Sequence, residues 1–327
     1  MMRHAAVLLL AALAATGCER QVVPATATSP QAPATTRTLV QQARGSIAAG
    51  DMAAAETTVT AFGAAHGETP EWLEAYSWLA RGHLAADRLD VAEKYAVGTY
   101  ERATASLKVR DMDAEPKLPI AYGAAVEVLG QIEARRGART EALLFLERER
   151  KKHEGTSVEK RIQKNINLLS LEGAPAPALS AAEHIGPPLL PLAETKGKVA
   201  LLFFWAHWCS DCKAMAPVLE RLEQTYRDAG LVIVAPTQRY GYVQAGAEAS
   251  PDQEAAYIAE VTRQSYPVLD DVSVPLDAAN HLRYGVSTTP TLVLVDRDGT
   301  IRLYHPGQMT LDALEPRVRA LLGNEPG

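Results

Sequence analysis

The residues with the clearest chemistry are Cys209 and Cys212, which enclose two residues in a Cys-Ser-Asp-Cys run. A cysteine pair at this spacing serves disulfide exchange, forms half of a zinc site, or makes an inert structural disulfide. A zinc site needs two further ligands, for which His207 and His281 are the candidates. The chain has three cysteines in all, and the third, Cys18, lies near the N-terminus. No cysteine is therefore left for a separate structural disulfide, and the pair taken alone leaves the three possibilities open.

The elements around the pair position it for that chemistry. Residues 198–205 are apolar at every position after Lys198 and rich in strand formers, which predicts a strand buried on both faces. Apolar residues then recur at helical spacing from 216 to 226, so the pair lies at a strand-to-helix junction. Free N–H groups and the helix dipole at that junction favour the thiolate of Cys209, which is predicted to be the nucleophile. Cys212, one turn further on, is predicted to be the more protected, resolving cysteine.

Three further features make the segment from about 184 to 322 resemble the thioredoxin family, most closely the membrane-anchored TlpA and ResA type. Trp208 directly precedes the pair, Pro217 lies in the following helix, and Thr289-Pro290 resembles the segment that holds a cis-proline in that family. A hairpin turn at 298–299 and a closing helix from about Leu311 fit the same pattern. The resemblance implies an α/β thioredoxin fold, a central mixed sheet flanked by helices, over residues 179–327.

The resemblance also implies roles for the site residues. Cys209 attacks a client disulfide and Cys212 resolves the mixed disulfide, with no cofactor and no metal. Trp208 shields the site, and the backbone of Thr289 before Pro290 docks the substrate. The other supporting residues are Ser210, Asp211 and Pro217. Phe203 stands where ordinary thioredoxins have a proton-shuttling Asp, and the candidate replacements, left unranked, are Glu248, Asp252 and Glu254.

Whether the protein reduces or oxidises its clients is indicated less directly by the sequence. A peroxidase is disfavoured because its Pro-x-x-x-Thr-x-x-Cys motif is absent, and copper delivery usually needs three residues between the cysteines. The charge of Asp211 disfavours a neighbouring thiolate, which points to a reductant, whereas His207 could act in the opposite sense. A reductant needs client proteins with disulfides or thiols and a membrane protein as electron donor. The alternatives are an oxidant or isomerase, and a non-enzymatic scaffold.

Residues 37–172 carry a different pattern, an internal repeat. The run Ala-Arg-Gly-Ser-Ile-Ala-Ala from Ala43 recurs as Ala-Arg-Gly-His-Leu-Ala-Ala from Ala80, and a third, weaker copy follows a loop predicted at 111–119. Paired amphipathic helices with short polar turns, at Gly50-Asp51, Asp87-Arg88 and Gly137-Ala138, resemble tetratricopeptide repeats. Such an array offers a binding surface for a protein partner, or it spaces the second domain. Residues 173–178, rich in Ala and Pro, are predicted to be a linker.

The first residues have the layout of an export signal. Residues 1–17 contain Arg3, an apolar run and small residues before Cys18, which resembles a bacterial lipobox with Cys18 as the lipidated residue. Residues 18–36 then form a predicted flexible tether. Glu19, rather than Asp, after the cysteine favours the outer membrane, facing the periplasm. The net charge of −6 and the lack of a basic cluster disfavour a nucleic-acid partner.

Overall fold

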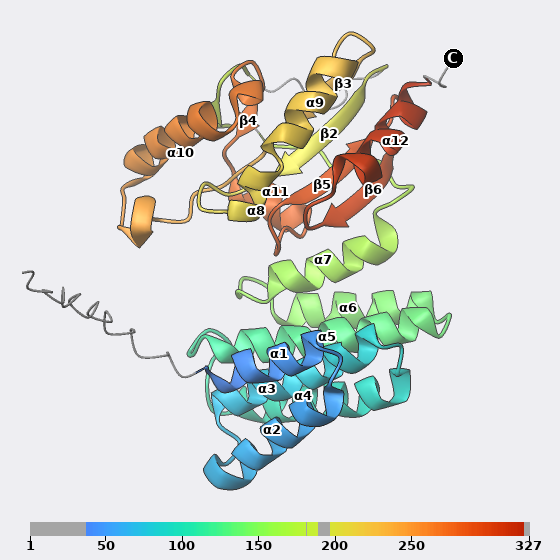
Figure 1. The fold of residues 1–327 in the computed structure, drawn as a ribbon, viewed down its shortest axis with the longest axis vertical. Coiled ribbons are helices and arrows are strands. Elements are labelled where there is room, and N and C mark those ends of the chain that lie inside the picture. The colour runs from blue at the N-terminus through green and yellow to red at the C-terminus, as the bar shows by residue number, and fades with distance from the viewer. Residues whose placement is uncertain (1–36, 181, 189–196, 324–327) are drawn as a thin grey trace, which may run out of the picture. The chain divides into compact units, whose positions relative to one another are not determined.

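The computed structural model describes residues 37–180, 182–188 and 197–323 (Figure 1). The predicted signal at 1–17, Cys18 and the whole predicted tether lie outside the described residues. Within the described part of the chain, no helix has the length and apolar character needed to cross a bilayer.

The region from 37 to 172 is helical, as predicted (Figure 1). The hairpin turns also lie where they were predicted, at Gly50, Asp87 and Gly137, each with a positive φ, of 77°, 55° and 88°. Such a residue ends a helix by taking the left-handed conformation, which Gly and Asp tolerate. The helices are α1 (Leu39–Ala48), α2 (Met52–His66), α3 (Pro70–Ala85), α4 (Leu89–Ser106), α5 (Lys117–Arg135), α6 (Arg139–Lys152) and α7 (Glu159–Ser170).

The predicted loop at 111–119 is shorter than expected. Helix α5 begins at Lys117, so Pro119 lies in its first turn and Pro116 is its N-cap. A proline is tolerated there because the first N–H groups of a helix have no partner within the helix. The two prolines therefore mark the start of a helix inside the range that was predicted to be a loop.

The second region is built on a four-stranded mixed sheet, as the predicted thioredoxin fold requires. Its strand order is β3-β2-β5-β6, with β2 parallel to β3 and the other neighbours antiparallel. Every residue of β2 is buried, which confirms the expectation for 198–205. The strands of this sheet are β2 (Val199–Phe204), β3 (Leu231–Val234), β5 (Thr291–Val295) and β6 (Ile301–Pro306), and a small antiparallel pair is formed by β1 (His184–Ile185) and β4 (Val274–Pro275).

Helices cover this sheet and close the fold. Residues of α9 and α12 pack with Leu201 and Phe203 in one core cluster, while Tyr284 and Leu171 pack with Leu202 on the other face. The predicted turn at 298–299 joins β5 to β6 and has Gly299 at φ 87°. The remaining elements are α8 (Ser210–Ala214), α9 (Ala216–Tyr226), α10 (Pro251–Ser265), α11 (Ala278–Arg283), α12 (Leu311–Leu322) and the 3-10 turns at Gln244–Gly246 and Pro267–Leu269.

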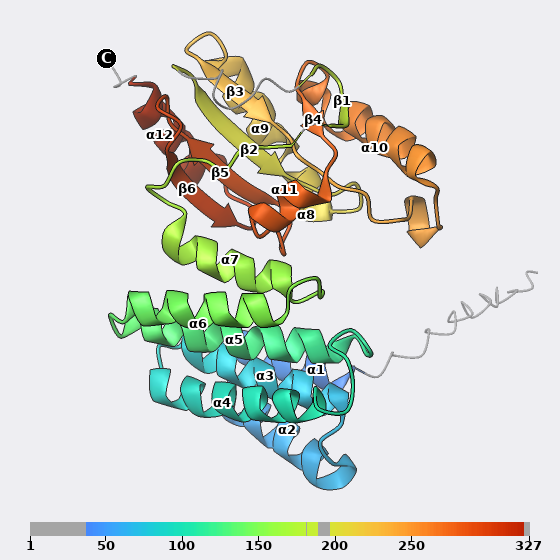
Figure 2. The same ribbon diagram turned by 180° about the vertical axis from the view of Figure 1, so that it is seen from behind.

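Helix α7 joins the helical region to the sheet region (Figure 2). It packs on α5 and α6 and also on α11 and β6, and Asn167 Nδ2 donates to the carbonyl of Arg283 at 3.4 Å. The segment predicted to be a linker follows α7 and is itself paired with the sheet, since the N–H of Gly173 donates to the Ile301 carbonyl at 2.9 Å and the N–H of Ala176 donates to the Gly299 carbonyl at 2.9 Å.

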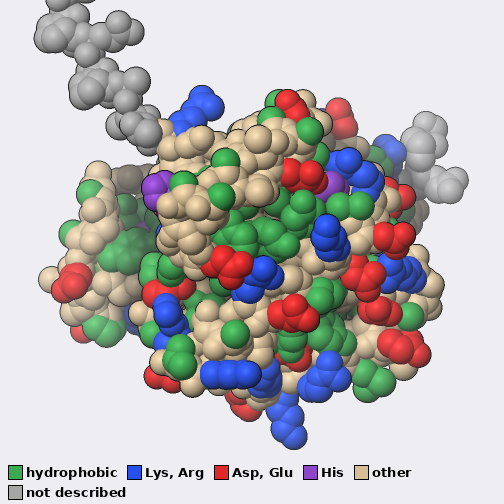
Figure 3. All heavy atoms as spheres, turned by 90° about the horizontal axis from the view of Figure 1, so that it is seen from below, with side chains coloured by type: hydrophobic (Ala, Val, Ile, Leu, Met, Phe, Trp, Pro, Cys, Tyr) green, Lys and Arg blue, Asp and Glu red, His purple; other side chains and the backbone are tan. Residues whose placement is uncertain are grey.

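The face drawn in Figure 3 carries acidic and basic side chains interspersed around patches of hydrophobic ones. Neither sign of charge dominates it.

Candidate active site

The two cysteines form a disulfide at the junction of β2 and α8. Their Cα atoms are 5.2 Å apart. Cys209 is the N-cap of α8, and the backbone N–H of Cys212 points at its sulfur at 3.0 Å. Cys209 is 4% exposed and Cys212 is fully buried. A client can therefore reach the sulfur of Cys209 alone, and the N–H of Cys212 is placed to stabilise a thiolate there.

Thr289 and Pro290 lie beside this disulfide. The peptide bond between them is cis, and the Thr289 carbonyl oxygen is 3.5 Å from Cys209 Sγ. Chain positions 287 and 288, just before it, are exposed. The fold thus brings the predicted docking segment, far away in the sequence, against the nucleophile.

The other predicted supporting residues surround the pair. Trp208 is half exposed and meets the ring of Tyr240 edge-on, with centroids 5.5 Å apart. Ser210 and Asp211 are exposed on α8. Pro217 lies in the first turn of α9, after a break at residue 215 that separates α8 from α9, because proline cannot continue the hydrogen bonds of a helix.

One of the three proton-shuttle candidates, Glu254, is buried, while Glu248 and Asp252 are exposed. Its Oε1 is 3.2 Å from Nε2 of His207, which lies two residues before Cys209. Both side chains are 1% exposed. Glu254 also accepts the backbone N–H groups of Tyr240 at 2.6 Å and of residue 241 at 2.8 Å.

Sequence reasoning missed this His207–Glu254 pair. Three rings enclose His207 edge-on, those of Tyr240, Tyr242 and Tyr257, with centroids 5.4 to 5.5 Å from it. Burial lowers the pKa of His207, although Glu254 acts in the opposite direction. The ring therefore stays uncharged near pH 7. The signal that could have found the pair is weak, because the two residues belong to different elements and only the fold brings them together.

His281, the other zinc-ligand candidate, lies elsewhere. It is fully buried and its ring meets Phe204 edge-on at 5.5 Å. Burial, with a smaller contribution from Lys160, lowers its pKa to about 3. Within the described part of the chain, no three His, Cys, Asp or Glu side chains are grouped as a metal ion would need.

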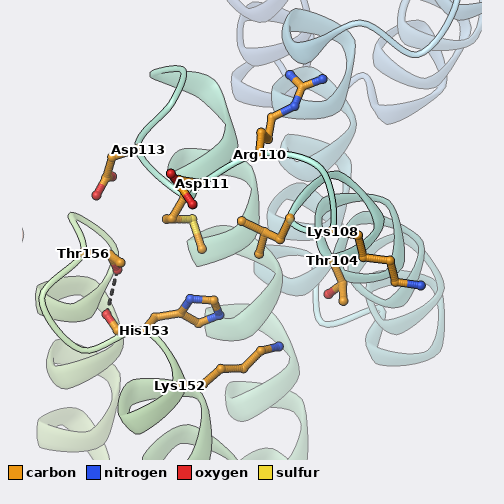
Figure 4. A pocket seen from close by; sticks show the side chains of 10 residues that line it. Thr104, Lys108, Arg110, Asp111, Asp113, Lys152, His153 and Thr156 are labelled. Atoms are coloured by element: carbon orange, nitrogen blue, oxygen red, sulfur yellow. Dashed lines mark hydrogen bonds between the residues drawn. The ribbon is translucent and has the colours of Figure 1, made fainter.

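The helical region contains a cavity of its own, of about 530 Å³ (Figure 4). Asp113 and Thr156 lie on one side of it in this view, Thr104 and Lys108 on the other, and the ring of His153 lies between them. Burial lowers the pKa of His153. The cavity is distant in sequence from the cysteines, and Asp113 borders it.

Comparison with known proteins agrees with this site. Residues 190–322 match the family model of the thioredoxin-like domain. The thioredoxin-like protein YneN of Bacillus subtilis is 33% identical over 128 residues, which are 39% of this chain and 67% of that protein. The thiol-disulfide oxidoreductase ResA of Oceanobacillus iheyensis is 30% identical over 136 residues, 41% of this chain and 62% of that protein.

Among solved structures, the pneumococcal exposed lipoprotein thioredoxin Etrx1 of Streptococcus pneumoniae is 28% identical, with a TM-score of 0.32 over 40% of this chain and 91% of that one. The family match covers the region that holds the Cys209–Cys212 disulfide. The chain therefore belongs to the thioredoxin-like family of thiol-disulfide oxidoreductases.

Proposed function

We propose that this protein reduces disulfides of client proteins in the bacterial cell envelope. The observation that carries the proposal is the charge around Cys209. Asp211, two residues after Cys209 in the first turn of α8, has an exposed carboxylate. Burial lowers the pKa of His207, so its ring is uncharged. The Asp211 carboxylate disfavours the thiolates and the uncharged His207 does not oppose it, so this arrangement favours the disulfide form of the enzyme and makes the dithiol form a good reductant.

The reaction is a two-electron exchange. The Cys209 thiolate attacks one sulfur of the client disulfide, and the other client sulfur leaves as a thiolate that takes up a proton. Cys212 then loses its proton and attacks Cys209 Sγ in the mixed disulfide. This step releases the reduced client and closes the Cys209–Cys212 bond. The buried position of Cys212 suits it to the second step alone. The enzyme must then be reduced again by a dithiol on another protein, for which we propose a membrane electron donor.

Anchoring belongs to the same proposal. Lipid on Cys18 would hold the protein on a membrane, with the outer membrane favoured by Glu19, and residues 18–36 would tether the folded part facing the periplasm. The test is incorporation of labelled palmitate, which Cys18→Ala should abolish while leaving disulfide exchange by the purified protein unchanged. A membrane-free protein in fractionated cells would contradict the anchor without affecting the redox proposal.

The reduction potential of the full chain tests the direction. Thiol alkylation across glutathione and dithiothreitol buffers should give a value near or below about −270 mV, that of thioredoxin. A value near about −120 mV would instead assign the protein to disulfide formation or isomerisation. Cys209→Ser should abolish exchange, and Cys212→Ser should accumulate the mixed disulfide. A double variant that keeps its cellular role would point to a scaffold.

A further inference from the structure

A second groove, of about 530 Å³, lies where the helical region meets the segment before Pro290. Three stretches of the helical region line it: the loop around Asp113, the start of α5 and the start of α7. The segment before Pro290 contributes Ser287. The groove is therefore built by both regions, although they are far apart in sequence.

The part of the groove lining that is available to a partner is apolar. Its apolar lining comes from Pro116, Pro119, Ile120 and Val158. Ile120 is 39% exposed, so a partner can contact it, whereas Val158 is 2% exposed. Apolar surface of this kind gains free energy when a partner covers it.

Its charged lining groups already have partners. Asp113 accepts the N–H of Ser157 at 3.1 Å and also bonds the Ser157 hydroxyl. Arg161 donates to Glu127 at 3.0 Å and to the Ile120 carbonyl at 3.0 Å. Glu115 accepts the backbone N–H at the start of α5 at 3.0 Å. Because the charged side chains of the lining are already paired within the protein, the groove is suited to an apolar group.

The groove lies close to the reactive disulfide. Ser287 precedes Thr289 by two residues, which span at most about 7 Å of extended chain, and the Thr289 carbonyl lies 3.5 Å from Cys209 Sγ. Positions 287 and 288 are exposed, so they offer a surface along which a polypeptide whose disulfide reaches Cys209 can lie. An extended strand advances about 3.3 Å per residue, so side chains about three to six residues from the client cysteine reach the groove.

The two sides of the groove are held together rigidly. Gly285 lies directly against the backbone of α7: a Cβ on it would come within 2.4 Å of the nitrogen of Lys164. Lys160 of the same helix also reaches Gln238, at 3.4 Å. The position of α7 therefore sets the position of the groove relative to Thr289, which lets the helical region contribute to recognition at the redox site.

We propose that this groove, lined by Pro116, Pro119, Ile120, Val158 and Ser287, docks the client polypeptide by seating an aliphatic side chain a few residues from the cysteine under attack. The inference rests on the proposed function and deepens it. It gives the helical region a part in client selection, with apolar segments flanking a disulfide as the favoured class of substrate.

The test compares peptides that differ in one side chain. Each peptide carries a single cysteine as a mixed disulfide with glutathione, in a background of Gly and Ser. Each peptide also carries one Leu, and the position of this Leu varies across the set from three to six residues before or after the cysteine. A matched set has Ser in place of Leu. The reduced full chain is mixed with each peptide and the release of glutathione is followed, with oxidised glutathione alone as the reference that cannot reach the groove.

The wild-type protein should react about tenfold faster with the Leu peptide at one or two adjacent spacings than with its Ser partner, which is about 1.4 kcal/mol. Ile120→Asp should remove this preference and leave the rate with oxidised glutathione unchanged. Val97→Asp is the matched control, because Val97 is also 39% exposed but lies on α4 outside the groove. It should keep the preference.

Equal rates for Leu and Ser peptides at every spacing, or a preference that survives Ile120→Asp, would overturn the docking proposal. So would a change of oligomeric state in Ile120→Asp without any effect on the peptides, because the groove would then be covered by a second copy of the chain. Failure of the proposed function looks different: the wild type would react no faster than Cys209→Ser even with oxidised glutathione.

Discussion

Glu127 in the helical region and two histidines, His207 and His281, in the thioredoxin-like region are buried ionisable side chains, and their surroundings have opposite effects on the charge. In the helical region, Glu127 accepts bonds from Lys164 at 2.7 Å and from Arg161 at 3.0 Å. Burial alone would raise the pKa of Glu127, but the two cations outweigh it and hold that pKa at about 2. In the thioredoxin-like region, burial instead lowers the pKa of His207 and of His281, so that both rings are uncharged.

This difference matches what each region has to do. A paired charge holds α5 to α7 and so supports the wall of the docking groove. A cation near Cys209 would stabilise its thiolate and weaken the enzyme as a reductant. Burial removes this contribution from His207 by lowering its pKa. Four sets of variants test the comparison.

The largest effect is expected at Glu127. Glu127→Ala leaves Arg161 and Lys164 without their common partner in a buried position, which costs about 3–5 kcal/mol of unfolding free energy. Urea unfolding at pH 7 measures it. Glu141→Ala, at an exposed position on α6, is the control and should change stability by less than about 0.5 kcal/mol. Equal effects of the two variants would show that the charges of the helical region contribute nothing through pairing.

The next largest effect is expected where the two regions meet. Gly285→Ala places a Cβ against the backbone of Lys164 at φ 61°, whereas Gly299→Ala has a similar positive φ but nothing within 4 Å. Left-handed backbone costs each alanine about 1–2 kcal/mol, and overpacking adds about 1–3 kcal/mol at Gly285 alone. Thermal unfolding of both variants separates the two contributions. Equal stability of the two variants would show that the close approach of α7 to Gly285 contributes nothing to the free energy of unfolding.

A smaller effect is expected at Glu254. The amide of Glu254→Gln keeps one acceptor oxygen for three groups that donate to or contact the carboxylate, so at least one buried group loses its partner at a cost of about 1–3 kcal/mol. Fluorescence of Trp208, which touches Tyr240, should report loosening of this loop during unfolding. Glu248→Gln, on the exposed surface, should behave as the wild type. An unchanged Glu254→Gln protein would exclude the pair as a structural element.

The effect that is smallest at neutral pH, and that grows only on acidification, is on acid stability. His281 has a folded pKa of about 3 and an unfolded pKa near 6.5. Between these values the unfolded state binds the extra proton, so stability falls as the pH drops below about 6.5, by at most about 1.4 kcal/mol per pH unit. Glu127 contributes in a lower window: its stabilisation is complete above about 4.3 and is lost as the pH falls towards about 2.

His281→Gln should therefore flatten the loss of stability between about pH 6.5 and 4, and His184→Gln, at an exposed site, should leave the curve unchanged. Hydrogen exchange at a series of pH values should show the thioredoxin-like region opening before the helical region on acidification. The reverse order would contradict the contrast between suppressed and paired charge.

Local sequence patterns predicted much of this molecule. The buried strand before the cysteines, the helical turns at Gly50, Asp87 and Gly137, and the hairpin at Gly299 each depend on residues within a few positions of one another. The start of α5 was missed because Pro116 and Pro119 are compatible with both a loop and a first helical turn. The family resemblance also anticipated the approach of Thr289 to the cysteine pair.

The sequence by itself determined the cysteine pair, its place between a strand and a helix, and the helical character of 37–172, because spacing and periodicity encode these locally. The burial of Glu254, the charge state of His207 and the groove beside Ser287 were decided only by tertiary structure. Each depends on how deeply a group is buried and on which distant group faces it. Desolvation and pairing are properties of the packed molecule that no short stretch of sequence contains.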